Sequence, residues 1–167
     1  MKTLIAIDPG LSGGIAYQRE GQPADAVPMP STEGDVMDFL RQLVIQPANT
    51  VAIIEEVGGY IGKAQPASRA FTFGRNFGFL LGVAQTLGVR VELVRPRRWQ
   101  KVLGVGQASI CASTSEWKNR LKAHAQRLFP YLRPTLKTAD ALLILEYAVQ
   151  ERRKLPKDTQ TIAIDAL

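Results

Sequence analysis

The chain has 167 residues but only one cysteine and one histidine. The single cysteine, Cys111, excludes an intramolecular disulfide and any zinc site built from cysteines. The single histidine, His124, likewise excludes a histidine-rich metal site. A metal ion bound here would therefore rest mainly on oxygen ligands, which favour Mg²⁺ or Mn²⁺ over Zn²⁺.

Long apolar runs are also lacking. No apolar stretch is long enough to span a bilayer, and the N-terminus has one positive charge but no small-residue cleavage site. We therefore expect neither a membrane segment nor a signal peptide. Hydrophobic residues still make up 46% of the chain, enough for one domain with its own core. We expect that domain to cover residues 1–152 and a tail to cover residues 153–167.

The charged residues are unevenly distributed along a chain with a net charge of +6. Residues 1–94 hold 7 Lys/Arg and 9 Asp/Glu, whereas residues 95–157 hold 14 and 4. An acidic-leaning part followed by a basic part suits the binding of a polyanion such as nucleic acid. The alternative is a solvated basic surface without a partner.

The most informative segment is the run from Ile5 to Ala16. Apolar residues lead into Asp8, a Pro-Gly turn follows, and a second apolar run begins at Ile15. This pattern predicts a β-hairpin with a carboxylate at the end of a buried strand. Such a carboxylate needs a metal ion, a basic side chain or another partner. The alternative is an aspartate that only caps the turn.

The rest of the chain alternates between strand and helix patterns. The expected strands cover residues 3–8, 13–18, 24–29, 51–57 and 89–94. The expected helices cover residues 33–45, 66–87, 114–128 and 138–152. Ser113 and Glu116 form a capping box before the third helix, Gly88 ends the second, and Thr138 is expected to cap the last. The order predicts an α/β fold with a mixed sheet and helices on its faces.

Three acids stand out by their positions. Asp8 ends the first strand, Glu55 lies near the end of the buried strand, and Asp140 lies in the first turn of the last helix. In open α/β sheets the functional site lies beyond the carboxyl ends of the strands. The three carboxylates could bind two Mg²⁺ ions, which is the arrangement used for phosphodiester cleavage. Taken singly, Asp140 could instead merely favour the helix dipole.

Five stretches in order carry a resemblance to a known family. They are Ile5–Gly10, Val51–Val57, Phe71–Leu80, Glu92–Lys101 and Ala139–Ile144. Together they resemble the RuvC family of Holliday junction resolvases, in the ribonuclease H-like (retroviral integrase) superfamily, and most closely its bacteriophage-type branch. The resemblance implies a ribonuclease H-like fold with a mixed five-stranded sheet and helices on both faces. It also implies a homodimeric, Mg²⁺-dependent endonuclease, with Mn²⁺ as a substitute, that leaves 5′-phosphate ends. The expected location is the cytoplasm of a bacterial or phage-infected cell.

The resemblance places the metal-binding, catalytic acids at Asp8, Glu55 and Asp140, with Glu55 rather than Glu56 as the catalytic glutamate. The family has a fourth acid three or four residues before the last aspartate. This chain has Lys137 and Leu136 there. Lys137 is expected to take a catalytic part by neutralising phosphate charge. The alternatives are that Glu56, Glu146 or water completes the metal shell.

The expected partner is branched DNA in the form of a four-way junction. Basic residues near the candidate site, and an aromatic residue in the glycine-rich loop after Glu55, are the expected contacts. They are Tyr60, Arg69, Arg75, Arg95, Arg97, Arg98, Lys101, Lys118 and Lys122. Trp99, between the arginines, is expected to lie in the core.

Two other functions stay open from the sequence. Loss of the fourth acid fits a protein that binds junctions but cuts them slowly or not at all. The Asp8-Pro9-Gly10 turn followed by Gly13-Gly14 also suits the phosphate loop of an actin-like phosphotransferase. That fold normally needs two such domains, for which this chain is short.

Overall fold

A computed structural model describes residues 2–56, 58 and 67–154. Its strands form one five-stranded sheet in the order β3-β2-β1-β4-β5. β1 pairs antiparallel with β2 and parallel with β4, and β4 pairs parallel with β5, so the predicted mixed sheet is confirmed. The strands are β1 (Thr3–Asp8), β2 (Gly14–Arg19), β3 (Asp25–Pro28), β4 (Thr50–Glu55) and β5 (Arg90–Val94).

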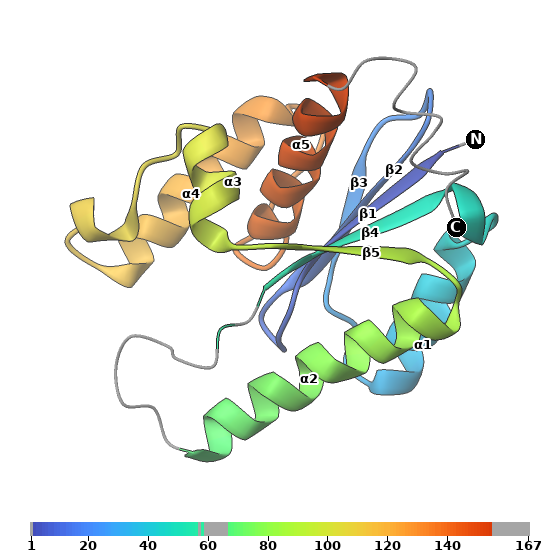
Figure 1. Cartoon of the computed structure of the whole chain (residues 1–167). Helices are drawn as coiled ribbons and strands as arrows, with labels where there is room; N and C mark the ends of the chain where they lie inside the picture. The colour runs from blue at the N-terminus through green and yellow to red at the C-terminus, as the bar shows by residue number, and fades with distance from the viewer. Residues whose placement is uncertain (1, 57, 59–66, 155–167) are drawn as a thin grey trace.

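Helices cover both faces of this sheet, as expected. They are α1 (Glu33–Leu43), α2 (Ala67–Thr86), α3 (Pro96–Val102), α4 (Thr114–Leu128) and α5 (Ala139–Lys154). Figure 1 shows α1 and α2 below the sheet and α3, α4 and α5 above it. Single 3₁₀ turns occur at Pro47–Asn49 and Ala108–Ile110. None of the helices within the described ranges is long and apolar enough to cross a membrane.

The sheet separates two hydrophobic cores, because alternate residues of each strand face opposite sides. Ile5 and Ile7 of β1 face α1 and α2, whereas Ala6 faces α3, α4 and α5. α5 packs directly on β1 and β2 and is apolar around most of its circumference, from Ala139 to Ala148. A helix buried to this extent fixes the position of every residue in its first turn, including Asp140.

Local capping explains why two helix ends match their predictions. Ser113 Oγ accepts a hydrogen bond from the Glu116 backbone N–H at 3.1 Å, and Glu116 Oε2 accepts one from the Ala112 backbone N–H at 2.8 Å. This reciprocal arrangement starts α4 at the predicted residue. Gly88, with φ +69°, ends the α2 segment by adopting the left-handed conformation that favours glycine.

Two features of the helices differ from the predictions. α3 is a seven-residue helix that was not predicted, because so short a helix shows no clear periodicity. The turn before α5 is capped by Thr135 rather than by Thr138. Thr135 Oγ1 accepts from the Lys137 and Thr138 backbone N–H groups at 3.2 and 3.3 Å. The Thr138 hydroxyl instead accepts from the Thr135 backbone N–H at 2.9 Å.

Candidate active site

The carboxyl ends of β1, β4 and β5 meet at one edge of the sheet, because these three strands are parallel. Asp8 is the last residue of β1 and Glu55 is the last residue of β4. Asp140 is the second residue of α5, which packs against β1. The fold therefore brings three acids from distant parts of the sequence to one edge.

Asp8 lies close enough to the other two acids to feel both of their charges. Burial raises the pKa of its carboxyl well above the ordinary value, and the neighbouring charges of Asp140 and then Glu55 raise it further. The ammonium of Lys118 opposes the shift. Asp8 and the two acids whose charges raise its pKa therefore share one poorly hydrated space, and the positive charge of Lys118 does not balance them.

Glu55 is held by a tryptophan. The Nε1–H of Trp99 donates a hydrogen bond of 2.7 Å to Oε2 of Glu55. Burial raises the pKa of Glu55 to about 7, the Trp99 hydrogen bond and the Lys118 charge lower it, and the Asp140 charge raises it. The hydrogen bond engages one carboxylate oxygen and leaves the other available to a ligand.

Asp140 pairs with a lysine from α4. Nζ of Lys118 lies 3.6 Å from Oδ2 of Asp140, and the aspartate side chain is only 17% exposed. Burial raises the pKa of Asp140, and Lys118 opposes that shift. Lys118 was expected to contact DNA from the surface of α4, but the structure turns it toward the acids.

The donor set of the cluster fits a hard divalent cation. Three carboxylates with raised pKa values need positive charge, and oxygen is the donor that Mg²⁺ and Mn²⁺ prefer. As the side chains stand, no group of three acidic, histidine or cysteine residues in the described ranges is arranged to ligate an ion. Trp99 engages Oε2 of Glu55 and Lys118 lies beside Oδ2 of Asp140, so an ion would draw on the other oxygens of these carboxylates after small rotations that keep both contacts.

Leu136 and Lys137 lie in the turn that leads into α5. Both side chains are exposed, and the Thr135 hydrogen bonds hold the turn in place. The turn also packs closely on β2, because a Cβ added to Gly14 would lie 2.6 Å from the backbone oxygen of Lys137. A fixed turn close to Asp140 thus carries a lysine and a leucine where the resembled family has its fourth acid.

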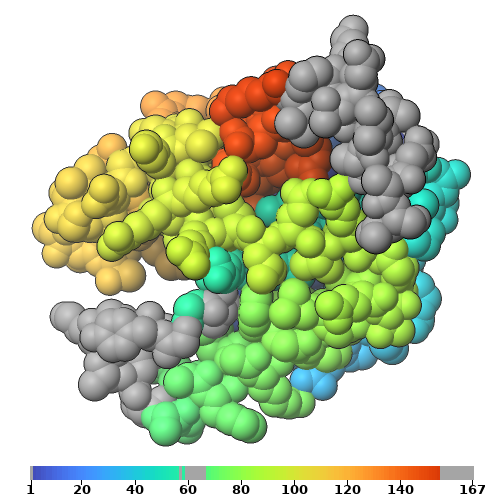
Figure 2. Space-filling model, viewed as in Figure 1, coloured from blue at the N-terminus to red at the C-terminus, as the bar shows by residue number. Residues whose placement is uncertain are grey.

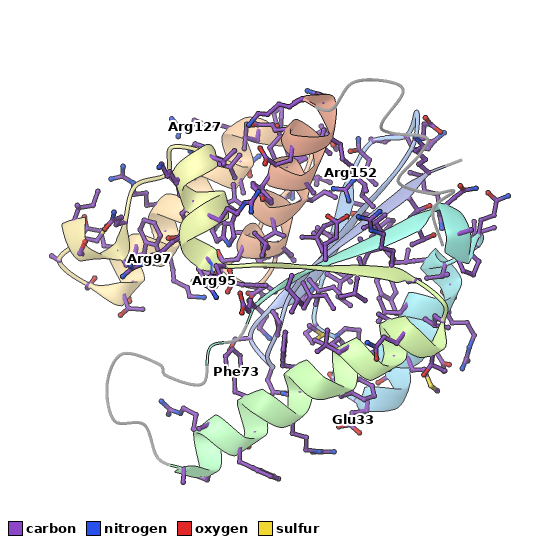
Figure 3. All side chains as sticks on the ribbon, in the orientation of Figure 1. Glu33, Phe73, Arg95, Arg97, Arg127 and Arg152 are labelled. Atoms are coloured by element: carbon purple, nitrogen blue, oxygen red, sulfur yellow. The ribbon has the colours of Figure 1, made fainter. Side chains whose placement is uncertain are left out.

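Gly10 and Phe73 join the turn after β1 to α2. Gly10 has φ +115°, and a Cβ added there would lie 3.2 Å from Cε2 of Phe73. The aromatic ring therefore packs directly over the glycine, close to the end of β1 (Figure 3). Both the backbone conformation and the close contact require glycine at this position, two residues after Asp8.

Besides Lys118, three of the predicted DNA contacts are engaged within the protein. Arg95 pairs at 2.9 Å with Glu56, the residue that follows the end of β4. Arg75 pairs with Glu33 at 2.6 Å and Arg98 with Glu151 at 3.5 Å. The arginine side chains of these pairs are 60–79% exposed, so each pair contributes little to stability and can exchange.

The other predicted contacts lie on exposed surface. Arg97 and Lys101 line a groove of about 440 Å³ on α3 and the glycine-containing segment that follows it. Figure 3 places Arg95 and Arg97 together at one end of α3, and Figure 2 shows that α3 and the start of α4 form a projecting lobe at that end of the molecule. Arg69 and Lys122 are exposed on α2 and α4. Tyr60 lies outside the described residues.

Sequence reasoning placed Trp99 in the core but missed its link to Glu55. The side chain is 1% exposed, so its core position is confirmed. A buried indole N–H needs an acceptor, and this was the one available signal that a polar partner would face it. Nothing local in the sequence identified that partner as a residue 44 positions earlier.

Comparison with known proteins supports the architecture. No protein-family model matches the chain, and no curated protein matches it in sequence. Among solved structures, the chain is similar to Thermus thermophilus RuvC in complex with a Holliday junction substrate, with a TM-score of 0.60 and 18% sequence identity. That alignment covers 92% of this chain and 97% of the other.

A second structure of Thermus thermophilus RuvC matches with a TM-score of 0.57 and 16% identity, over 90% of this chain and 95% of the other. The fold is therefore ribonuclease H-like, as predicted. Among proteins with this fold, the chain is similar in architecture to RuvC along nearly the whole length of both chains.

Proposed function

We propose that this protein is a divalent-cation-dependent endonuclease that resolves four-way DNA junctions by paired nicks. The observation that carries the proposal is the meeting of Asp8, Glu55 and Asp140 at the carboxyl edge of the sheet, with each pKa raised by burial. Buried acids that lack sufficient positive charge suit a site that takes up Mg²⁺ or Mn²⁺. The fold of a structure bound to a Holliday junction adds support.

Each acid has a role that its position favours. Asp8 and Asp140 would hold the cation, and Glu55 would offer the oxygen that Trp99 leaves free. A bound divalent ion activates water and stabilises charge on the phosphate that is cut. Lys137, exposed in the turn before α5, would neutralise phosphate charge.

The projecting lobe formed by α3 and the start of α4 is the proposed DNA-binding surface. Arg97 and Lys101 line its groove, and Arg95 and Arg98 can exchange their carboxylate partners for phosphates. Arg69, Arg75 and Lys122 extend the basic surface along α2 and α4. Each phosphate contact releases counterions, so affinity should fall steeply with rising salt concentration.

A homodimer fits both the substrate and the surface. Paired nicks in strands of like polarity need two active sites related by symmetry. α2 offers a face for a second copy, since Phe71 is 74% exposed and a Cβ added to Gly74, Gly78 or Gly82 would contact nothing. Two such helices could approach closely along the three glycines, which lie four residues apart.

The sequence stretch around Trp99 and Gln100 supports a relationship to the bacteriophage-type branch of the RuvC family. The proposed place of action is the cytoplasm. Recombination, repair and the processing of phage DNA are all compatible pathways. The fourth acid of the family is missing, since Leu136 and Lys137 occupy the two positions where it could stand. This favours a second function, a junction-binding protein with weak or no cleavage.

The test is a cleavage assay on a labelled four-way junction and on a linear duplex of the same sequence. We expect Mg²⁺- or Mn²⁺-dependent symmetrical nicks in the junction alone, and religation of the products by ligase because they carry 5′-phosphates. Asp8→Asn should bind the junction and leave it intact. Binding without cleavage at every protein and metal concentration would favour the junction-binding function instead.

A further inference from the structure

Lys118 lies within the acid cluster rather than on the outer surface of α4. Its Nζ is 3.6 Å from Oδ2 of Asp140, and its side chain is 38% exposed. Its positive charge also lowers the pKa values of Asp8 and Glu55. One ammonium group therefore acts on all three acids of the candidate site.

The charges of this cluster match one divalent ion. With the three carboxylates ionised and Lys118 protonated, two negative charges remain, and a single Mg²⁺ neutralises them. In the site without DNA, a second ion would leave an excess of positive charge and would bring a dication close to an ammonium in a poorly hydrated space. Repulsion between such charges is strong where water is excluded.

The small number of oxygen ligands also favours a single bound ion. Oε2 of Glu55 accepts the Trp99 hydrogen bond, so this carboxylate has only one uncommitted oxygen. The turn before Asp140 offers Leu136 and Lys137, neither of which can ligate a cation. Two ions in one site normally share carboxylate ligands, and this cluster has few to share.

We propose that the ammonium of Lys118 takes the place of a second metal ion, so that each site binds one divalent cation. The proposal rests on the cation-dependent nuclease function and replaces the pair of ions expected from the sequence. Lys118 supplies beside Asp140 the positive charge that a second ion would bring. The chain thereby works with three acids where the resembled family has four.

The test counts Mn²⁺ ions bound to the full-length protein. Calorimetry with MnCl₂ gives the number of ions per chain, and low-temperature electron paramagnetic resonance distinguishes an isolated Mn²⁺ from a magnetically coupled pair. The measurements are made with and without a four-way junction. Ions scattered along the DNA do not give the coupled signal, so the resonance spectrum reports the pair of ions in the site even when DNA is present. The variants are Lys118→Met, Lys118→Arg, which keeps the charge, and Asp8→Asn, with Lys122→Met as a control on the same helix.

The native protein and Lys122→Met should each bind one tight Mn²⁺ per chain and give no coupled signal. Lys118→Met should gain a second, coupled ion or bind the first about tenfold more tightly, because a nearby unit charge is removed. Lys118→Arg should resemble the native protein. Circular dichroism spectra and thermal melts would establish that each variant is folded.

Several results would overturn the proposal. A coupled Mn²⁺ pair in the native protein would refute the role of Lys118 and leave the nuclease function standing. Identical ion number and affinity in the native protein and a folded Lys118→Met would do the same. If the native protein binds no Mn²⁺, or if Asp8→Asn binds Mn²⁺ as well as the native protein does, this inference and the cation-dependent function are both refuted.

Discussion

The Nε1–H of Trp99 donates a 2.7 Å hydrogen bond to Oε2 of Glu55, and this contact joins α3 to the end of β4. Each group needs the other. The indole is 1% exposed and has no access to solvent water, while the burial of Glu55 penalises its ionised form. The bond therefore fixes the direction of the carboxylate and favours its charge.

Trp99→Phe should keep most of the packing but lose this bond. We expect a loss of about 1–3 kcal/mol in the free energy of unfolding, because a buried carboxylate loses its donor. The pKa of Glu55 should rise further above about 7, since the hydrogen bond lowers it. Urea unfolding and the pH dependence of Mn²⁺ affinity measure the two effects. Trp117→Phe, at a buried tryptophan of α4, is the matched control and should leave the pH dependence unchanged.

Stability without metal should depend on pH in an unusual direction. The pKa of Glu55 is raised from 4.5 to about 7 in the folded protein, so the folded state binds the proton more tightly than the unfolded state. Stability should therefore fall as the pH rises from about 4.5 to about 7, by on the order of 3 kcal/mol from this group. The raised pKa values of Asp8 and Asp140 act in the same direction.

Thermal melts of the metal-free protein at a series of pH values check this expectation. Glu55→Gln should flatten the decline, and Mg²⁺ should raise the melting temperature more at high pH than at low pH, because it competes with protons. A melting temperature that increases steadily between those pH values would contradict the assigned pKa shifts.

Asp8→Asn should stabilise the metal-free protein while it abolishes cleavage. The amide replaces the carboxyl whose pKa is raised by burial and by the charges of Asp140 and Glu55. At a pH of about 8 we expect a gain of about 1–2 kcal/mol, as is common when a strained functional site is relieved. Denaturant unfolding measures the gain. Asp38→Asn, which breaks an exposed ion pair with Arg41, should change stability by less than about 1 kcal/mol.

The architecture was readable from the sequence because its signals are local. Asp8 follows an apolar run and precedes a Pro-Gly turn, and Ser113 with Glu116 sets the start of α4. The Trp99–Glu55 and Lys118–Asp140 contacts were not readable, because they join residues far apart in the chain and depend on how the helices pack. A basic helix gave no sign of which lysine turns inward.

Restoring an acid beside Asp140 should strengthen cation binding. Leu136→Asp adds a carboxylate to an exposed position in the fixed turn before α5. We expect about tenfold tighter Mn²⁺ binding and faster nicking, since each added carboxylate contributes both a ligand and a charge. Leu136→Asn, which has the same shape without the charge, is the control. Equal Mn²⁺ affinity in the two variants would show that this turn does not face the ion.

The proposed dimer should depend on the glycines of α2. Gly78→Arg places a long charged side chain where a Cβ now meets open space, so the monomer should fold normally. We expect the native chain to sediment as a dimer and the variant to sediment as a monomer that binds junctions but no longer makes paired nicks. Asn119→Arg, exposed on α4 beyond the opposite face of the sheet, should stay dimeric. A dimeric Gly78→Arg would exclude this face as the interface.

Glu33, Glu56 and Glu151 hold Arg75, Arg95 and Arg98 as a phosphate would hold them. For the proposed substrate, these glutamates are built-in competitors. A nucleic acid that reaches a single arginine exchanges one anion for another with little net gain. Under the proposed function, a branched molecule that reaches several of these arginines at once would gain from every exchange together, which would favour it over a duplex that reaches fewer.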